Sequence, residues 1–242
     1  MHFRLVDSDL VSPERSAAID EAILLARDRG SVPDTLHLYR RDRPTVSLGY
    51  FERTSTCLDK GAMERLGVKT VRRASGGSAI YTDPGQLIYS VIMDRRSVPE
   101  DPQTTFRMLC QGLVLGLEEL GVRADYRPVN DILVDGRKIS GSAQMRRGCA
   151  VLQHGTLLVS VDYDRMFAVL RSSKRVRASM VSLSELIEPV PSMDAVKKAV
   201  VRGFSRALGC SIERGTLTSS EVKDVDELVA TKYGRDEHTY LR

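Results

Sequence analysis

The sequence has 242 residues, enough for one sizeable hydrophobic core, and its 42% hydrophobic and 28% charged composition is that of a packed soluble protein. A net charge of +4 is too small to indicate nucleic-acid binding by itself, although it suits acidic partners. The start of the chain lacks the apolar core of a signal peptide, and no apolar stretch approaches the ~20 residues of a membrane span.

The first predicted element is a helix that begins after Ser12. Serine caps helices, and Pro13 suits the first turn. The helix would run to Gly30 and bury Ala18, Ala22 and Ile23. The segments LHLYR and TVSLGY follow as predicted strands, and a short helix around Met63 would end at Gly67. VKTVRR then leads into a glycine-rich turn, and LIYSVIM is an apolar run typical of a buried strand.

The second half contains more helix. A helix from Pro102 to about Leu120 would be closed by Gly121. ILVDGRKIS is typical of a hairpin with Asp135-Gly136 at its turn, and VLQHGTLLVSV is a further strand. From about Tyr163 the chain is predicted to be mostly helical, with helices over 193–208 and 221–233. We expect an α+β fold with a mixed, largely antiparallel sheet flanked by helices, as a single domain over residues 1–242.

Three segments carry residue types suited to chemistry. The first is RRASGGSAIY, from Arg72 to Tyr81, in which paired glycines let the backbone approach a ligand and Arg73 adds charge for a phosphate or carboxylate. It is neither a Walker loop nor a dinucleotide fingerprint, because GK[ST] and GxGxxG are absent. On the glycines alone, a simple tight turn remains the favoured interpretation.

The second segment runs from Asn130-Asp131 through GRKISGSAQ. Lys138 lies beside small residues that leave room for a ligand, and Asp131 is a candidate metal ligand. The third is Gln153-His154-Gly155, in an apolar strand where a glycine indicates a bulge or the approach of a ligand. A solvated hairpin lysine and a hydrogen-bonded core histidine are the plain alternatives. The sequence contains no GxSxG motif and no metal-ligand spacing among its four histidines.

Together, in this order, the three segments resemble the lipoate–protein ligase family, which is related to biotin–protein ligases and octanoyltransferases. RRASGGSAIYTD, Val129-Asn130-Asp131, KISGSAQ and HGTLL are similar to that family's motifs, and the similarity extends from near Ile19 to about Asp164. The resemblance implies an ATP-dependent ligase that activates lipoate or octanoate as an acyl-AMP and transfers it to a lysine of another protein. It also implies Mg²⁺, with Asp131 as the metal ligand.

The resemblance further implies the role of each site residue. Lys138 would be catalytic, bridging the acyl carbonyl and the α-phosphate and stabilising the charge that develops there. The residues expected to bind ATP or the adenylate are Arg73, Gly76, Gly77, Ser78, Ala79, Ile80, Tyr81, Asn130 and Lys138. Those expected to bind lipoate are Arg73, Ser75, Gly77, Lys138, Gly141, His154 and Gly155.

The implied partners are lipoyl-domain acceptors, namely acyltransferase subunits of 2-oxoacid dehydrogenases and the glycine-cleavage H protein. Neither nucleic acid nor membrane is expected as a partner. Some short family members obtain a C-terminal accessory domain as a separate small protein, and we expect the same here, because residues after Asp164 are predicted to complete the catalytic domain.

Two other functions stay open. An octanoyl or lipoyl acyltransferase would take its acyl group from a carrier through an acyl-cysteine, and such a mechanism needs a thiolate. Ser78 replaces the third glycine of the loop, Thr82 replaces a usual histidine, and Pro-Gly-Gln leans towards the octanoyltransferases. Of the cysteines Cys57, Cys110, Cys149 and Cys210, only Cys149 is near the site in sequence, at a position typical of an inert core cysteine. All four are expected to be free thiols in a cytoplasmic protein. The third function is binding of lipoate or adenylate without turnover.

Overall fold

The computed structural model describes residues 2–171 and 177–242. Its strands are β1 (His2–Val11), β2 (Asp34–Arg41), β3 (Thr45–Leu48), β4 (Lys69–Arg72), β5 (Ile80–Thr82), β6 (Gln86–Asp94), β7 (Asp125–Arg127), β8 (Asp131–Val134), β9 (Arg137–Arg147), β10 (Ala150–Leu158) and β11 (Ser211–Arg214). Its α-helices are α1 (Pro13–Asp28), α2 (Thr54–Cys57), α3 (Lys60–Arg65), α4 (Pro102–Glu118), α5 (Tyr163–Val169), α6 (Met193–Leu208), α7 (Ser219–Leu228) and α8 (Asp236–Thr239). Short 3₁₀ turns are η1 (Arg95–Ser97), η2 (Arg177–Ser179) and η3 (Leu183–Glu185), and η4 (Val229–Tyr233) is π-helical.

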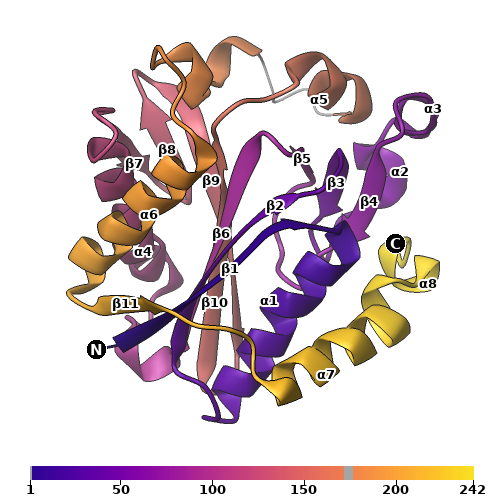
Figure 1. Ribbon diagram of the computed structural model, residues 1–242. Coiled ribbons are helices and arrows are strands. Elements are labelled where there is room, and N and C mark those ends of the chain that lie inside the picture. Colours follow the sequence, from indigo (N-terminus) through magenta and orange to yellow (C-terminus); the bar gives the residue numbers. More distant parts are fainter. Residues whose placement is uncertain (1, 172–176) are drawn as a thin grey trace.

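The large sheet has the order β11-β1-β2-β6-β10-β9-β8-β7, and a smaller sheet has the order β4-β3-β5. In the large sheet β1 is parallel to both β11 and β2, whereas the remaining neighbours are antiparallel. Helices α4 and α6 cover one face of the large sheet, and α1 and α7 cover the other (Figure 1). The predicted α+β fold with a largely antiparallel sheet is therefore confirmed.

Local sequence signals account for several elements. The Ser12 side chain accepts a hydrogen bond from the Arg15 amide at the start of α1, as the capping pattern predicts. Asp135 and Gly136 both have positive φ at the β8–β9 turn, as expected of a tight Asp-Gly hairpin. The predicted helices over 193–208 and 221–233 correspond to α6 and to α7 with η4. Residues 172–176 of the predicted helical remainder lie outside the described residues.

Four strands, β1, β5, β7 and β11, were absent from the sequence prediction, and two of them, β1 and β11, lie together at one end of the large sheet. β1 lies between β11 and β2, yet its second half is polar and carries a bulge between Asp7 and Asp9. The short strand β11 lies within the region predicted to be mostly helical. Neither has the continuous apolar run or the strict alternation by which a strand is identified from sequence, so their pairing is a consequence of tertiary contacts.

Arg72 connects the glycine-rich loop to the C-terminal segment. Its guanidinium is fully buried and donates to the carbonyl oxygens of Gly49 (2.8 Å), Glu52 (2.8 Å) and Thr239 (3.0 Å). A buried guanidinium needs such partners, since an unpaired charge in the interior is costly. Arg72 is thus a structural cross-link, while its neighbour Arg73 lies at the candidate site.

Candidate active site

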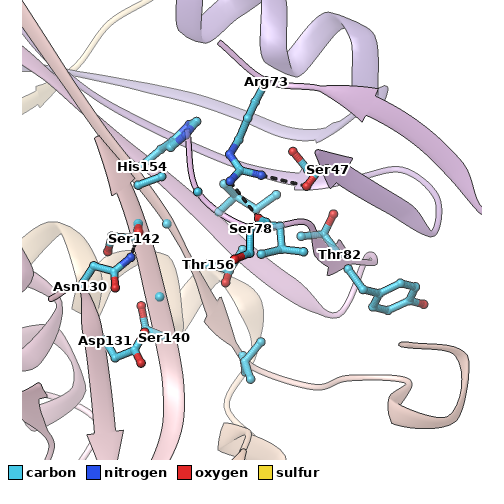
Figure 2. A pocket seen from close by; sticks show the side chains of 18 of the residues that line it. Ser47, Arg73, Ser78, Thr82, Asn130, Asp131, Ser140, Ser142, His154 and Thr156 are labelled. Carbon is cyan, nitrogen blue, oxygen red and sulfur yellow. Dashed lines mark hydrogen bonds between the residues drawn. The ribbon is translucent and has the colours of Figure 1, made fainter. Parts of the chain in front are cut away.

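A cavity of about 440 Å³ lies between α1, the large sheet, the glycine-rich loop and the β8–β9 hairpin. The sequence-predicted residues that line it are Arg73, Gly77, Ser78, Ile80, Tyr81, Asn130, Asp131, Lys138, Gly141, His154 and Gly155. Figure 2 shows Arg73 and His154 on one side of this space and Asn130 and Asp131 on another. Three predicted residues are not part of its lining: Ser75 and Ala79 are buried behind the wall, and Gly76 faces Phe51. The fold therefore brings together most of the predicted residues from three separate segments.

The glycine-rich loop is held by Arg73. Its guanidinium is 7% exposed and donates to the carbonyls of Ser47 (2.8 Å), Gly76 (2.7 Å) and Ser78 (3.0 Å), and to the Ser75 hydroxyl (3.1 Å). Gly77 has a φ of 90°, which side chains on L-residues rarely permit. Arg73 thus shapes the loop from behind; its predicted contact with a nucleotide stays a prediction.

Lys138 extends from β9 into the cavity and is paired with Asp131 on β8. Its Nζ atom lies 2.6 Å from Asp131 Oδ1, and Arg127 donates to Asp131 Oδ2 at 2.7 Å. A Cβ at Gly141 would lie 2.6 Å from Nζ, so the glycine leaves the space that the lysine occupies. The Lys138 side chain is 38% exposed, which lets it reach both a ligand and its carboxylate partner.

The Asp131 carboxylate does not fit a metal site in this arrangement. Each of its oxygens faces a cation of the chain, Lys138 or Arg127. Within residues 2–171 and 177–242, no group of three or more histidine, cysteine or acidic side chains has metal-binding geometry. The assignment of Mg²⁺ to Asp131 stays a prediction, and we derive no step through a metal.

Polar groups of the hairpin line the same side as Lys138. The Asn130 side-chain amide donates to the Ser142 carbonyl, and the Ser142 amide donates to the Asn130 carbonyl at 3.0 Å. The Ser142 hydroxyl is hydrogen-bonded to the Tyr89 hydroxyl at 2.7 Å. Burial raises the pKa of Tyr89 well above its ordinary value, so it remains a neutral phenol. Asn130 is therefore fixed as a bridge between the ends of the hairpin.

His154 on β10 lies against the glycine-rich loop. One ring nitrogen is 2.6 Å from the Ser75 hydroxyl and the other is 3.2 Å from Asp20 on α1. At the next residue, Gly155, a Cβ would lie 2.7 Å from the Gly141 carbonyl oxygen and 2.8 Å from the Tyr89 hydroxyl. The glycine is thus needed for close strand packing beneath the cavity. The sequence suggested either a hydrogen-bonded core histidine or a ligand-facing one. In the structure His154 is hydrogen-bonded and also lines the cavity.

The sequence prediction missed the wall formed by α1 and the C-terminal segment. Glu21 lines the cavity and accepts hydrogen bonds from Lys232 (2.7 Å) and Tyr233 (2.5 Å), and Tyr233 also lines it. Leu24 on α1, together with Tyr39, Ile88 and Leu152 on the strands beneath it, adds apolar or aromatic surface. Asp20 and Glu21 are acidic residues on the otherwise mostly apolar inward face of α1. This interruption of the apolar pattern could have indicated from the sequence that α1 lines a site.

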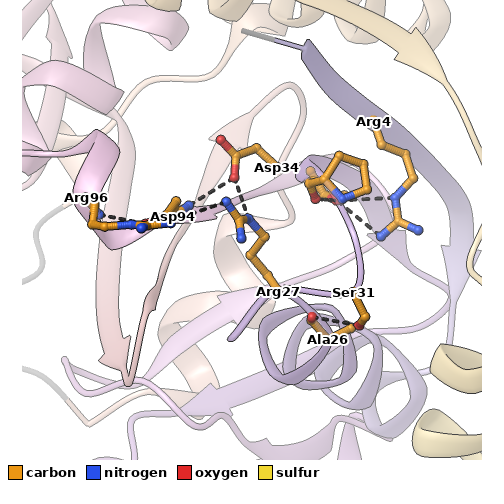
Figure 3. A network of polar contacts seen from close by, with 9 residues as sticks. Arg4, Ala26, Arg27, Ser31, Asp34, Asp94 and Arg96 are labelled. Carbon is orange, nitrogen blue, oxygen red and sulfur yellow. Dashed lines mark hydrogen bonds and ion pairs between the residues drawn. The ribbon is translucent and has the colours of Figure 1, made fainter. Parts of the chain in front are cut away.

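Helix α1 is anchored at its C-terminal end, where Arg27 lies. Arg27 donates to Asp34 at 2.7 Å and to Asp94 at 3.1 Å, and Arg96 pairs with Asp94 at 2.8 Å (Figure 3). Hydrogen bonds from Arg96 hold the pKa of Asp94 well below its ordinary value. The network joins the end of α1 to β2 and β6, so the helix that carries Asp20 and Glu21 is fixed against the sheet.

The cysteines lie outside the cavity lining. Cys110 is buried, within 3.7 Å of the Ser142 hydroxyl, and burial raises the pKa of its thiol to about 11. Cys149 is exposed in the turn between β9 and β10, where its amide donates to Asp28. The expectation of an inert core position for Cys149 is therefore wrong, because β10 begins one residue later, at Ala150. Cys57 and Cys210 also lie outside the lining.

Within residues 2–171 and 177–242, every helix is too short or too polar to cross a membrane.

Comparison with known proteins places the site in context. Residues 12–205 match the model of the lipoyl protein ligase A/B catalytic domain. Octanoyltransferase LipM of Kyrpidia tusciae is 35% identical over 99% of both chains, and that of Symbiobacterium thermophilum is 34% identical over 97% of both. A bi-partite lipoate protein ligase from Thermoplasma acidophilum superposes with a TM-score of 0.90 and 29% identity, covering 100% of this chain and 98% of its own.

These similarities correct the reaction expected from the sequence. An ATP-dependent ligase was expected, yet the relatives that match along nearly the whole chain are octanoyltransferases. The expectation failed because the glycine-rich loop, the lysine hairpin and the HGTLL strand resemble both kinds of enzyme. Those motifs therefore do not specify what activates the acyl group.

Proposed function

Because the chain belongs to the lipoyl protein ligase A/B catalytic-domain family, we propose that it is an octanoyltransferase. It moves an octanoyl group from the thioester of an acyl carrier protein to the ε-amine of a lysine in a lipoyl-domain protein, without ATP. The observation that carries the proposal is the similarity to octanoyltransferases along nearly the whole chain. The position of Lys138 supports it, because its ammonium reaches a cavity lined by apolar as well as polar side chains.

The cavity suits one medium-length acyl chain. Its volume of about 440 Å³ falls within the range of ~300–1,000 Å³ that is usual for small-molecule sites. Leu24, Ile88 and Leu152 offer apolar contact beneath α1 for the hydrocarbon. At the other end, Lys138 and the glycine-rich loop would face the acyl carbonyl. The carbonyl would then lie beside Lys138, whose side chain is 38% exposed, and so within reach of a carrier and an acceptor lysine.

Lys138 would supply electrostatic stabilisation. When an amine attacks the thioester carbonyl, negative charge develops on the carbonyl oxygen, and a preorganised ammonium stabilises it. Asp131 holds Lys138 at 2.6 Å and so keeps it in the cavity before substrate arrives. The carboxylate acts through Lys138 and is a positioning residue.

The transfer is direct in this proposal. No cysteine belongs to the cavity lining within the described ranges, and all four cysteines of the chain are among the described residues. The lysine nitrogen forms the new C–N bond, the C–S bond breaks, and the departing thiolate takes up the proton that the amine loses. The step balances without an oxidant, a metal or an enzyme-bound intermediate.

The partners follow from the same reaction. The donor is an octanoyl-carrying protein and the acceptors are lipoyl-domain proteins, such as those first expected from the sequence. The separate accessory subunit stays a prediction.

The test uses the purified chain with an octanoylated carrier protein and a lipoyl domain, in a chelator and without ATP. Mass spectrometry of the lipoyl domain should show the mass of one octanoyl group. A parallel reaction supplies free octanoate with ATP and Mg²⁺. Octanoylation in the second reaction but not the first would overturn the proposal.

A further inference from the structure

A chain of buried hydrogen bonds runs behind the cavity wall and links four structural elements to the glycine-rich loop. Ser8 on β1 contacts His37 on β2 at 2.9 Å, and His37 contacts Asp20 on α1 at 2.9 Å. Asp20 contacts His154 on β10 at 3.2 Å, and His154 contacts Ser75 at 2.6 Å. Of these residues, Asp20 and His154 also line the cavity, which makes the chain of contacts part of the site.

The contact with Asp20 determines the tautomer of His154. An ionised carboxylate can only accept, and His154 Nδ1 lies 3.2 Å from Asp20 Oδ2, so Nδ1 carries the ring proton. In a neutral ring Nε2 is then the acceptor, and the Ser75 hydroxyl, 2.6 Å away, donates to it. The Ser75 oxygen still accepts a hydrogen bond from Arg73 Nε at 3.1 Å.

Asp20 is prepared for that role. It is 4% exposed, and it also accepts hydrogen bonds from His37 (2.9 Å) and from the Ser90 hydroxyl (2.8 Å). Burial raises the pKa of this carboxyl, but the hydrogen bonds from His154 and His37 outweigh that effect and hold the pKa well below its ordinary value. Asp20 is thus an anion with donors on both oxygens.

The far end of the chain of contacts controls the shape of the loop. Arg73 connects Ser75 to the carbonyls of Gly76 and Ser78, on either side of Gly77 with its φ of 90°. A packed apolar core would cost less than burying these polar groups, since each one must be fully satisfied to be tolerated. What the polar contacts add is one defined loop conformation beside the acyl site.

We propose that Asp20 is a positioning residue: by fixing the tautomer of His154 it orients Ser75 and so holds the glycine-rich loop in the conformation that octanoyl transfer requires. The kinetic part of this inference rests on the proposed function. The tautomer part does not, because it concerns the free protein alone.

The direct test is the tautomer of His154, measured by ¹⁵N NMR of the imidazole nitrogens in the otherwise unmodified protein. His154→Asn supplies the assignment of the signals. The expected result is a protonated Nδ1 and an unprotonated Nε2. An Nδ1 that carries no proton would overturn the inference, whether or not the protein transfers octanoyl groups.

The second test is Asp20→Asn. Asp20 also accepts from the Tyr39 hydroxyl at 3.3 Å, and an amide has only one oxygen to accept from both histidines and from the hydroxyls of Ser90 and Tyr39. The His154 signals should therefore shift towards the other tautomer. kcat/KM for octanoyl transfer should fall by about 10²-fold, the typical effect of a small misplacement at a reacting centre. Ser90→Ala is the matched control: it removes one donor to Asp20 and leaves both histidine contacts, so transfer and the His154 signals should stay near wild type.

Ser75 provides a variant that places less strain on the fold. Ser75→Thr keeps the hydroxyl and should retain transfer, whereas Ser75→Ala should lose most of it while remaining folded, with a lower unfolding midpoint because buried Arg73 Nε and His154 Nε2 lose a partner. Equal activity of Ser75→Ala and wild type, or wild-type kcat/KM in a folded Asp20→Asn protein, would contradict the inference. If the wild-type protein transfers no octanoyl group, the proposed function fails, and the NMR result alone decides the role of Asp20.

Discussion

The ammonium of Lys138 occupies the space that a side chain at Gly141 would fill, since a Cβ built at Gly141 would lie 2.6 Å from Nζ. The two residues are on the same strand, β9, and the glycine leaves the lysine free to pair with Asp131. The small residue and the cation thus form one functional unit, as the KISGSAQ pattern indicates.

Removal of the cation tests this unit. Lys138→Ala should lower the rate of octanoyl transfer by at least ~10²-fold, because it removes stabilisation of the charge that develops on the carbonyl oxygen. Steady-state kinetics with an octanoylated carrier protein measure the effect. Lys138→Arg keeps the charge with a different shape and should retain more activity than the alanine variant. Unchanged kcat in a folded Lys138→Ala protein would show that the lysine is only a solvated hairpin residue.

The glycine-rich loop gives a second prediction. Gly77→Val should abolish transfer, because Gly77 has a φ of 90° and a Cβ there would already lie 3.0 Å from Arg73 Nη2. Gly30→Val is the matched control, since Gly30 has a φ of 71° and open space around it. Both variants should lose unfolding free energy in urea titrations through backbone strain, Gly77→Val more because of its contact with Arg73, whereas only Gly77→Val should lose activity. Equal activity of the two variants would show that the loop is merely a turn.

The cysteines should be dispensable for the reaction. Cys149→Ser and Cys110→Ser are expected to keep octanoyl transfer, because neither thiol lines the cavity and burial raises the pKa of Cys110 to about 11. The measurement is the transfer rate, together with mass spectrometry of the protein quenched in acid during turnover. An octanoyl thioester found on either cysteine would replace direct transfer with an acyl-enzyme mechanism.

Glu185 predicts a pH dependence of stability. Burial raises its pKa, but hydrogen bonds from Arg177 and Ser182 outweigh that effect and lower it from 4.5 to about 2. A carboxyl with a depressed folded-state pKa stabilises the fold above its unfolded value, and this stabilisation is lost as pH falls from about 4.5 to about 2. The shift corresponds to at most ~3 kcal/mol, which solvent screening reduces.

The variant Glu185→Gln should therefore unfold at lower urea concentration than wild type at neutral pH, and the difference should vanish near pH 2. The exposed residue Glu64 gives the control, because Glu64→Gln should shift the urea midpoint little at any pH. A difference between Glu185→Gln and wild type that is constant with pH would mean that the ion pair with Arg177 does not contribute as described.

The sequence predicted the parts of the site that depend on local pattern. Paired glycines, a lysine beside small residues and a histidine-glycine pair are visible within short segments, and the fold brings Gly77, Lys138 and His154 to one cavity. Helix α1 was recognisable because Ser12 and Pro13 start it, and the β8–β9 hairpin because Asp135-Gly136 accommodates positive φ.

What the sequence did not reveal depends on contacts between distant segments. The pairing of Glu21 with Lys232 and Tyr233 joins the first helix to the end of the chain, and no local pattern encodes it. Asp20 lies on the predicted helix α1, but its role depends on contacts with His37 on β2 and His154 on β10, which the sequence does not reveal. The choice between ligase and transferase had one signal in the sequence, the Pro-Gly-Gln stretch, which leans towards the octanoyltransferases, and the three main motifs did not separate the two.

The contacts of Arg72 have a consequence for the order of events during protein synthesis. Its guanidinium joins the carbonyls of Gly49 and Glu52 to that of Thr239, and Tyr233 forms part of the cavity wall. A nascent chain that has emerged from the ribosome only as far as the HGTLL strand already contains the glycine-rich loop, Lys138 and His154. Its acyl cavity still lacks one wall, and Arg72 lacks one of its carbonyl partners. The cavity acquires this wall, and Arg72 this carbonyl partner, only once the segment that carries Tyr233 and Thr239 has been synthesised and has folded.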